Sequence, residues 1–76
     1  MNANRRKELQ KVWDSICEIE ATLESLRDDE QDYLDNIPEN LQSSERYETA
    51  ESAVDALDSA ISSLEEAMDY IDEAKG

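Results

Sequence analysis

The sequence predicts an all-α protein, an antiparallel two-helix hairpin of coiled-coil-like type that dimerises into a four-helix bundle. Apolar residues recur at alternating gaps of three and four in both halves of the 76-residue chain, which is the spacing of one face of a helix. The chain has one Gly, one Pro and no Phe, a composition that favours long helices over a sheet. This length predicts a single domain over residues 1–76.

A first helix is expected over about residues 4–35. Its apolar positions are Leu9, Val12, Ile16, Ile19, Leu23, Leu26 and Tyr33. Glu30 is the one charged residue in this series. Trp13 and Leu34 widen the apolar stripe on one flank, as in a helix that packs against more than one neighbour. Asn2 and Asn4 are candidate N-caps.

The connection is expected at residues 36–43. Asn36 can adopt the left-handed conformation that ends a helix, and Pro38 lacks the N–H that a continuing helix needs. Pro38 can begin a short helical turn, and Ile37 and Leu41 would then close the end of the hairpin. Ser43 or Ser44 can cap the second helix.

The tip of the hairpin has two interpretations. Arg46 can reach Asp35 or Glu39 and fasten the turn, which is a structural role. Alternatively, the larger side chains at the tip insert into a partner protein. These side chains are Ile37, Leu41, Arg46 and Tyr47.

A second helix is expected over about residues 44–74. Residues 47–74 contain nine carboxylates and no Lys or Arg. The apolar positions are Tyr47, Ala50, Val54, Leu57, Ile61, Leu64, Met68 and Ile71. Alanine precedes each cycle of the repeat, at Ala53, Ala60, Ala67 and Ala74, and an acidic residue follows it, at Glu51, Asp58, Glu65 and Asp72. This column of alanines permits close approach of another helix, or it reflects the high helix propensity of Ala.

Two helices of similar length joined by a short connection predict an antiparallel pair. A turn centred near residue 40 predicts four core pairs: Leu9 with Ile71, Ile16 with Leu64, Leu23 with Leu57, and Leu26 with Val54. It also places Arg27 near Glu51 and Glu20 near Asp58.

A two-helix hairpin leaves its apolar seam half open, so we expect a partner, most simply a second copy of the chain. The residues expected to form the core and oligomer seam are Trp13, Ile16, Leu23, Val54, Leu57, Ile61, Leu64 and Met68.

The residue types argue against an enzyme, a cofactor or a metal centre. The chain has no His and a single Cys17, which is interpreted either as a small filler beside the stripe or as a reactive thiol. The acidic segment 28–32 lacks the Gly and terminal Glu spacing of a calcium loop. The longest apolar run is two residues, so no membrane span is expected, and a cytoplasmic location is the default.

The charge indicates which partners are favoured. The chain has 21 acidic and seven basic residues, a net charge of −14, which opposes direct binding to nucleic acid or an anionic membrane. A basic, nucleic-acid-binding protein is the favoured partner. The favoured role is inhibition of that protein by nucleic-acid mimicry. The alternative is a scaffolding homo-oligomer whose acidity serves solubility. The residues expected to bind the partner are Asp55, Asp58, Glu65, Glu66, Asp69, Asp72 and Glu73.

The basic residues at the start of the chain also have two interpretations. They are Arg5, Arg6, Lys7 and Lys11. In an antiparallel hairpin they return to the acidic end that contains Asp69, Asp72 and Glu73, where they would neutralise those carboxylates. Alternatively, they anchor a phosphate or an acidic surface.

The segment Asp-Asn-x-Pro-x-x-Leu-x-x-Ser-Glu-Arg at residues 35–46, with the acidic heptads around it, resembles small acidic helical proteins encoded by phages and mobile elements of Gram-positive bacteria. The similarity covers nearly the whole chain but carries over no functional residues. It implies a mobile-element setting, in which small acidic proteins that inhibit host nucleic-acid machinery are common.

Overall fold

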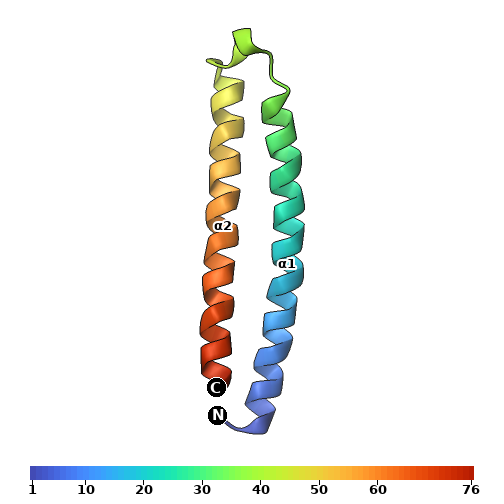
Figure 1. Ribbon diagram of the computed structural model, residues 1–76, viewed down its shortest axis with the longest axis vertical. Helices are drawn as coiled ribbons and strands as arrows, with labels where there is room; N and C mark the ends of the chain where they lie inside the picture. The colour runs from blue at the N-terminus through green and yellow to red at the C-terminus, as the bar shows by residue number, and fades with distance from the viewer.

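The computed structural model describes residues 1–76 as a helical hairpin without strands (Figure 1). Helix α1 spans Ala3–Asp35, a 3-10 turn η1 spans Glu39–Leu41, and helix α2 spans Glu45–Lys75. The two long helices run antiparallel and form a rod of 59 × 15 × 12 Å. The predicted all-α hairpin is therefore confirmed. Neither helix combines the length and the apolar character needed to cross a membrane.

The helix ends are set by short polar side chains. The Asn2 side chain accepts a hydrogen bond from the Arg5 backbone N–H at 2.8 Å, and the Ser44 hydroxyl accepts one from the Tyr47 N–H at 3.3 Å. Asn36 ends α1, but with φ −92° and ψ 0° rather than the expected left-handed conformation. Its side-chain amide instead donates to the Asp32 carbonyl at 2.7 Å, so the cap is made by a side chain and needs no left-handed residue.

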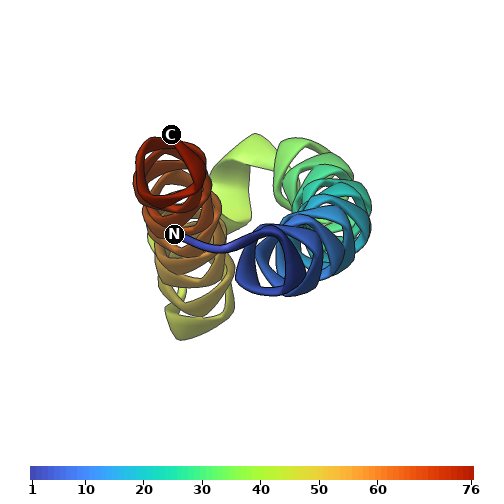
Figure 2. The same ribbon diagram turned by 90° about the horizontal axis from the view of Figure 1, so that it is seen from below.

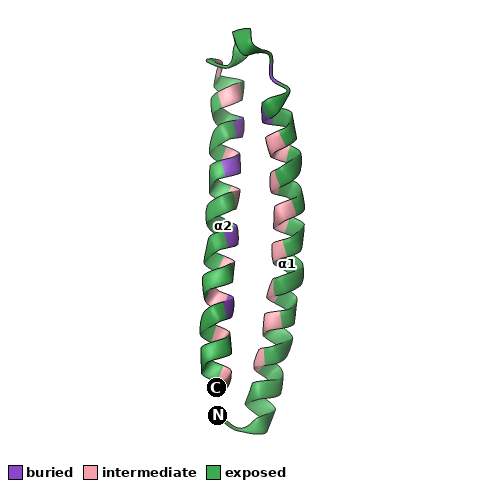
Figure 3. Cartoon of the chain, in the orientation of Figure 1, coloured by how far each residue is buried: buried purple, intermediate pink, exposed green.

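The core is thin and is thickest near the turn (Figure 3). Six residues are buried, and they are Leu34, Ile37, Ala50, Val54, Ile61 and Met68. Four of them, Leu34, Ile37, Ala50 and Val54, form one cluster, against which Tyr47 packs. Ile37 closes the end of the hairpin as predicted. Leu41 does not, because the 3-10 turn directs it to solvent, where it is 44% exposed.

Helix α1 uses a different face for the contact than its heptad predicted. Trp13 and Leu34 lie in the contact itself, half-buried and buried, instead of widening its flank. The apolar series at every seventh residue, Val12, Ile19, Leu26 and Tyr33, is exposed. Packing Trp13 and Leu34 against α2 turns this series away from the seam, because residues one position apart on a helix point about 100° apart.

The register also differs from the prediction. The Arg27 guanidinium binds the Asp58 carboxylate at 2.8 Å, and the Lys75 ammonium donates to the Gln10 side chain. The predicted neighbour of Arg27 was Glu51, so α2 is displaced by one heptad. The four predicted core pairs are correspondingly out of register.

The connection explains this displacement. Pro38 is extended, with φ −55° and ψ 144°, so the chain continues past the end of α1 before η1 reverses it. Ile37 thereby packs with Ala50 and Val54, and Leu34 joins this cluster in the place predicted for Leu26. Arg46 does not bind Asp35 or Glu39. It donates to the Tyr33 hydroxyl and lies over the Tyr33 ring, 5.4 Å from its centroid.

The same displacement leaves the start of α1 beyond the end of α2 (Figure 1). Lys11 pairs with Glu8 of its own helix at 3.4 Å, and Arg6 donates to the Met1 carbonyl. The predicted neutralisation of Asp69, Asp72 and Glu73 by these bases is therefore wrong. The base beside Asp72 is Lys75, at 3.1 Å.

The seam can be tested by placing a charge in it. Ile61 is 5% exposed, so Ile61→Asp buries a carboxylate without a partner and should cost at least about 3 kcal/mol, a large part of the stability of so small a chain. We expect loss of the helical signal in far-ultraviolet circular dichroism. Ser59→Asp, on the exposed side of α2, adds the same charge and should retain that signal. Retention of full helicity by Ile61→Asp would contradict the packing.

The register can be tested by a double-mutant cycle. Arg27→Met combined with Asp58→Asn should show a coupling energy of about 0.5 kcal/mol, as for a partly exposed ion pair. Arg27→Met combined with Glu51→Gln should show none, because Glu51 lies one heptad away. Urea unfolding measures both cycles, and coupling to Glu51 alone would support the register expected from the sequence.

Candidate protein-interaction faces

The contact between the helices divides the hairpin surface into two broad sides. The Arg27–Asp58 pair shows which flanks of α1 and α2 lie on the same side, and the seven-residue repeat extends this assignment along both helices. Figure 2, seen along the long axis, shows a single layer of two helices with no element covering either side. One side is strongly acidic and the other is nearly uncharged.

The acidic face comprises the carboxylates on the Arg27–Asp58 side. Its members are Asp14, Glu20, Glu24, Asp28 and Asp35 of α1 and Glu48, Glu51, Asp55, Asp58, Glu65, Asp69 and Asp72 of α2. The neutral face lies opposite and, between residues 12 and 33 of α1 and residues 53 and 74 of α2, has one charged residue, Asp29, which follows Ser15 and Thr22 in the repeat. Its uncharged members are Val12, Ser15, Ile19, Thr22 and Leu26 of α1 and Ala53, Ala56, Ala60, Ser63, Ala67, Tyr70 and Ala74 of α2.

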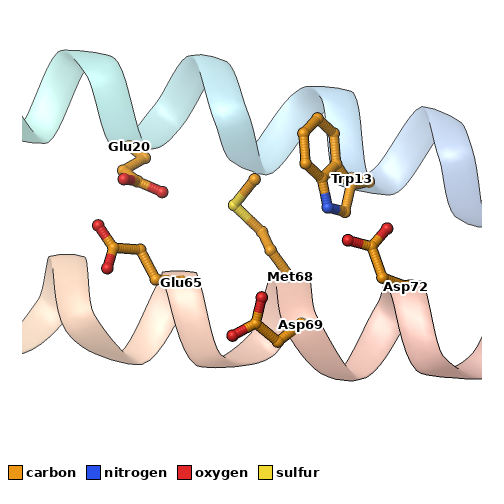
Figure 4. Close-up of a pocket in the computed structure, with 6 residues that line it drawn as sticks. All are labelled: Trp13, Glu20, Glu65, Met68, Asp69 and Asp72. Atoms are coloured by element: carbon orange, nitrogen blue, oxygen red, sulfur yellow. The ribbon is translucent and has the colours of Figure 1, made fainter.

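A hollow of about 310 Å³ opens on the acidic face between the helices (Figure 4). Its lining residues are Trp13, Glu20, Glu65, Met68, Asp69 and Asp72. The Trp13 indole N–H is buried without a protein acceptor, and the Lys75 ammonium lies 5.9 Å from the centroid of the Trp13 ring. The hollow therefore combines one aromatic floor with four carboxylates at its edges.

Three carboxylates meet beside this hollow. Oxygen atoms of Glu20, Glu24 and Glu65 lie within 4.8 Å of one another. Partial desolvation raises the pKa of Glu20, and hydrogen bonding to Glu65 and the negative charges of Glu65 and Glu24 raise it further. The predicted neighbour of Glu20 was Asp58. Because the true register is one heptad further, Glu65 takes that place, and sequence reasoning missed the three-carboxylate cluster.

All seven predicted partner-binding acids are exposed. Asp58 and Asp72 are bound to Arg27 and Lys75, respectively. The other five have no basic group within 4.0 Å. Five of the seven belong to the acidic face, while Glu66 and Glu73 lie on the outer side of α2, away from α1.

Few carboxylates in the chain are neutralised by a neighbour. Ion pairs engage four of the 21 acidic residues, namely Glu8, Asp28, Asp58 and Asp72. The net charge of −14 along a 59 Å rod amounts to one negative charge for about every 4 Å, close to the ~3.4 Å spacing of phosphates along one DNA strand.

The eight predicted seam residues all lie along the contact between α1 and α2. Val54, Ile61 and Met68 are buried, and Trp13, Ile16, Leu23, Leu57 and Leu64 are half-buried. They hold the two helices of one chain together. The apolar surface left for another molecule is instead the exposed series Val12, Ile19, Leu26 and Tyr33, which the sequence had placed in the seam. The large side chains of Trp13 and Leu34, one residue after two of these positions, were the available signal for the true seam.

The clustered carboxylates predict a pH effect on stability. Because the folded chain raises the pKa of Glu20 above its ordinary 4.5, it binds this proton more tightly than the unfolded chain does. The stabilisation is fully present below that ordinary pKa and is lost as pH rises through the raised value. Glu20→Gln should therefore increase the urea midpoint at neutral pH, and its advantage should shrink in acid.

Glu66→Gln is the matched control, since it removes the same charge from an exposed site outside the cluster. The prediction concerns the difference between the two variants. Equal gains at neutral pH would mean that only net charge matters and that the cluster has no specific effect.

No protein-family model, curated protein or solved structure matches the chain. Roles for individual residues therefore come from the charge, exposure and register of the chain itself.

Proposed function

We propose that this protein is a non-enzymatic interaction module that binds a basic, nucleic-acid-binding protein and blocks its nucleic-acid site by mimicking a phosphate backbone. The charge spacing along the rod carries this proposal. One negative charge for about every 4 Å gives a groove lined with Lys and Arg a field similar to that of one nucleic-acid strand. The resemblance to acidic proteins of phages and mobile elements supports a host protein in the bacterial cytoplasm as the target.

The availability of the carboxylates supports the same role. Asp55, Glu66, Asp69 and Glu73 are exposed and have no ion-pair partner, so a basic partner would not have to break existing salt bridges to reach them. They project from one continuous helix, which fixes their spacing before binding. Such a field accelerates encounter with an oppositely charged protein and weakens as salt screens it.

A scaffolding homo-oligomer is the second candidate function. The observation that favours it is the neutral face, where Val12, Ile19 and Leu26 are about half exposed, at 46%, 53% and 51%. In this function the chain binds copies of itself, and the acidic residues keep the assembly soluble.

Binding to a basic protein can be tested with the immobilised chain and a nuclease-treated bacterial lysate. The proposal predicts capture of a nucleic-acid-binding protein, release by duplex DNA or by RNA, and weaker capture as salt rises. The decisive variant carries four neutral substitutions on α2, namely Asp55→Asn, Glu66→Gln, Asp69→Asn and Glu73→Gln. At about 0.5 kcal/mol for each exposed charge, the affinity for the captured protein should fall roughly 30-fold.

The control removes four charges from exposed positions of α1 and the turn that lie outside the acidic face, through Glu18→Gln, Asp29→Asn, Asp32→Asn and Glu39→Gln. It has the same net charge as the α2 variant, so a purely nonspecific attraction would weaken equally in both. Captured proteins that neither bind nucleic acid nor compete with it would refute mimicry.

A further inference from the structure

We propose that a second copy of this chain docks on the neutral face, with α1 of each copy packed against α2 of the other. The two-fold axis runs parallel to the rod, so the four helices form a bundle in which every neighbouring pair is antiparallel. This assigns a face and a geometry to self-association and is independent of whether the acidic face binds a basic protein.

The apolar series on α1 lacks a partner within the hairpin. Val12, Ile19, Leu26 and Tyr33 recur at every seventh residue, yet each is at least 40% exposed. A hollow on the same flank is lined by Glu18, Ile19, Thr22 and Leu23. Residues at heptad spacing form a straight stripe that can contact a partner helix along its full length. This stripe therefore fits another long helix.

The charge distribution identifies that helix as part of a second copy. Two copies carry −14 each and repel one another wherever their carboxylates meet. The neutral face is the long surface with the fewest charges, since each copy presents only Asp29 on it. A basic partner gains little there, because that face offers it a single carboxylate.

The sizes of the side chains on the two helices are complementary. The observed register places Ile19 level with Ala67 and Leu26 level with Ala60, within one residue, and the seven-residue repeat extends this match toward both ends. Rotation about an axis parallel to the rod preserves these levels. Each large α1 residue of one copy therefore meets a small α2 residue of the other, which lets the helices approach closely.

The hairpin has enough exposed surface for an interface of ordinary size. A compact monomer of 8.7 kDa is expected to expose about 4,700 Å², whereas the hairpin exposes 5519 Å². This difference of roughly 800 Å² reflects the elongated shape of the whole rod, and a standard protein–protein interface covers about 800 Å² on each partner. The rotation also leaves the acidic face of each copy on the outside of the bundle, on opposite sides.

Analytical ultracentrifugation of the full chain tests the stoichiometry. We expect a mass of twice 8.7 kDa, and the dimer should strengthen with added salt, because salt screens the repulsion between the acidic bodies. Leu26→Glu and Ala60→Glu should each weaken the dimer at least about 100-fold by burying unpaired charge in it. Ser59→Glu adds the same charge on the exposed side of α2 and should leave the mass unchanged.

Disulfide trapping tests the geometry. In a Cys17→Ser background, chains with Leu26→Cys are mixed with chains carrying Ala60→Cys and then oxidised. The proposed arrangement predicts that the mixture cross-links at least about ten times faster than either chain alone, since residue 26 of one copy meets residue 60 of the other. Faster linking of the Leu26→Cys chain with itself would overturn this geometry in favour of contact between the two α1 helices.

Two further outcomes decide the proposal. A monomer mass at the highest soluble concentration would refute it. If Leu26→Glu unfolds, the wild-type melting temperature decides: a rise with protein concentration supports a dimer, and a constant value overturns it. Failure of the dimer is distinguishable from failure of nucleic-acid mimicry, because salt strengthens the first interaction and weakens the second.

Discussion

The whole structure depends on a narrow apolar seam that holds two strongly acidic helices together. Only six of 76 side chains are buried, and none of the largest is fully enclosed. This seam works against the mutual repulsion of a net charge of −14. Gathering carboxylates on one side of the contact adds to this repulsion, as the pKa of Glu20 indicates, which is raised by desolvation and also by Glu65 and Glu24 beside it. The apolar seam therefore has to offset the repulsion that the acidic face creates.

The fold was predictable because its determinants are local and repeated. The heptads specify helices, Asn2 and Ser44 mark where the helices begin, and Pro38 marks the break between them. The register was not predictable from the repeat, because a slip of one heptad preserves the character of most positions: Glu51, Asp58 and Glu65 are interchangeable neighbours for Arg27. The choice among them is made at the turn, where the extended Pro38 and the cluster around Ala50 set how far α2 is displaced.

The exposed acids of α2 could be predicted from the sequence, whereas the neutral face and the carboxylate cluster could not. The exposed acids of α2 follow directly from the absence of Lys and Arg between residues 47 and 74, so their accessibility needed no knowledge of packing. Predicting the neutral face required knowing which side of α1 packs against α2. The apolar series Val12, Ile19, Leu26 and Tyr33 competes for the seam with a mixed series, and the bulk of Trp13 and Leu34 favours the mixed one. That series is Trp13, Glu20, Arg27 and Leu34. Predicting the carboxylate cluster also required the register of the two helices, since Glu20 meets Glu65 only after the one-heptad displacement.

The start of α1, which extends beyond the end of α2, affects how the molecule is oriented as it approaches a charged partner. Arg5, Arg6 and Lys7 lie beyond the end of α2, while the body of the rod is acidic, so the long axis carries a permanent electric dipole. A cationic groove attracts the body and repels this tip. The resulting torque turns the rod during approach, before any atoms touch, and favours one of the two end-to-end orientations. In the proposed binding to a basic protein, the bases of the first turn would therefore influence which way round the rod docks.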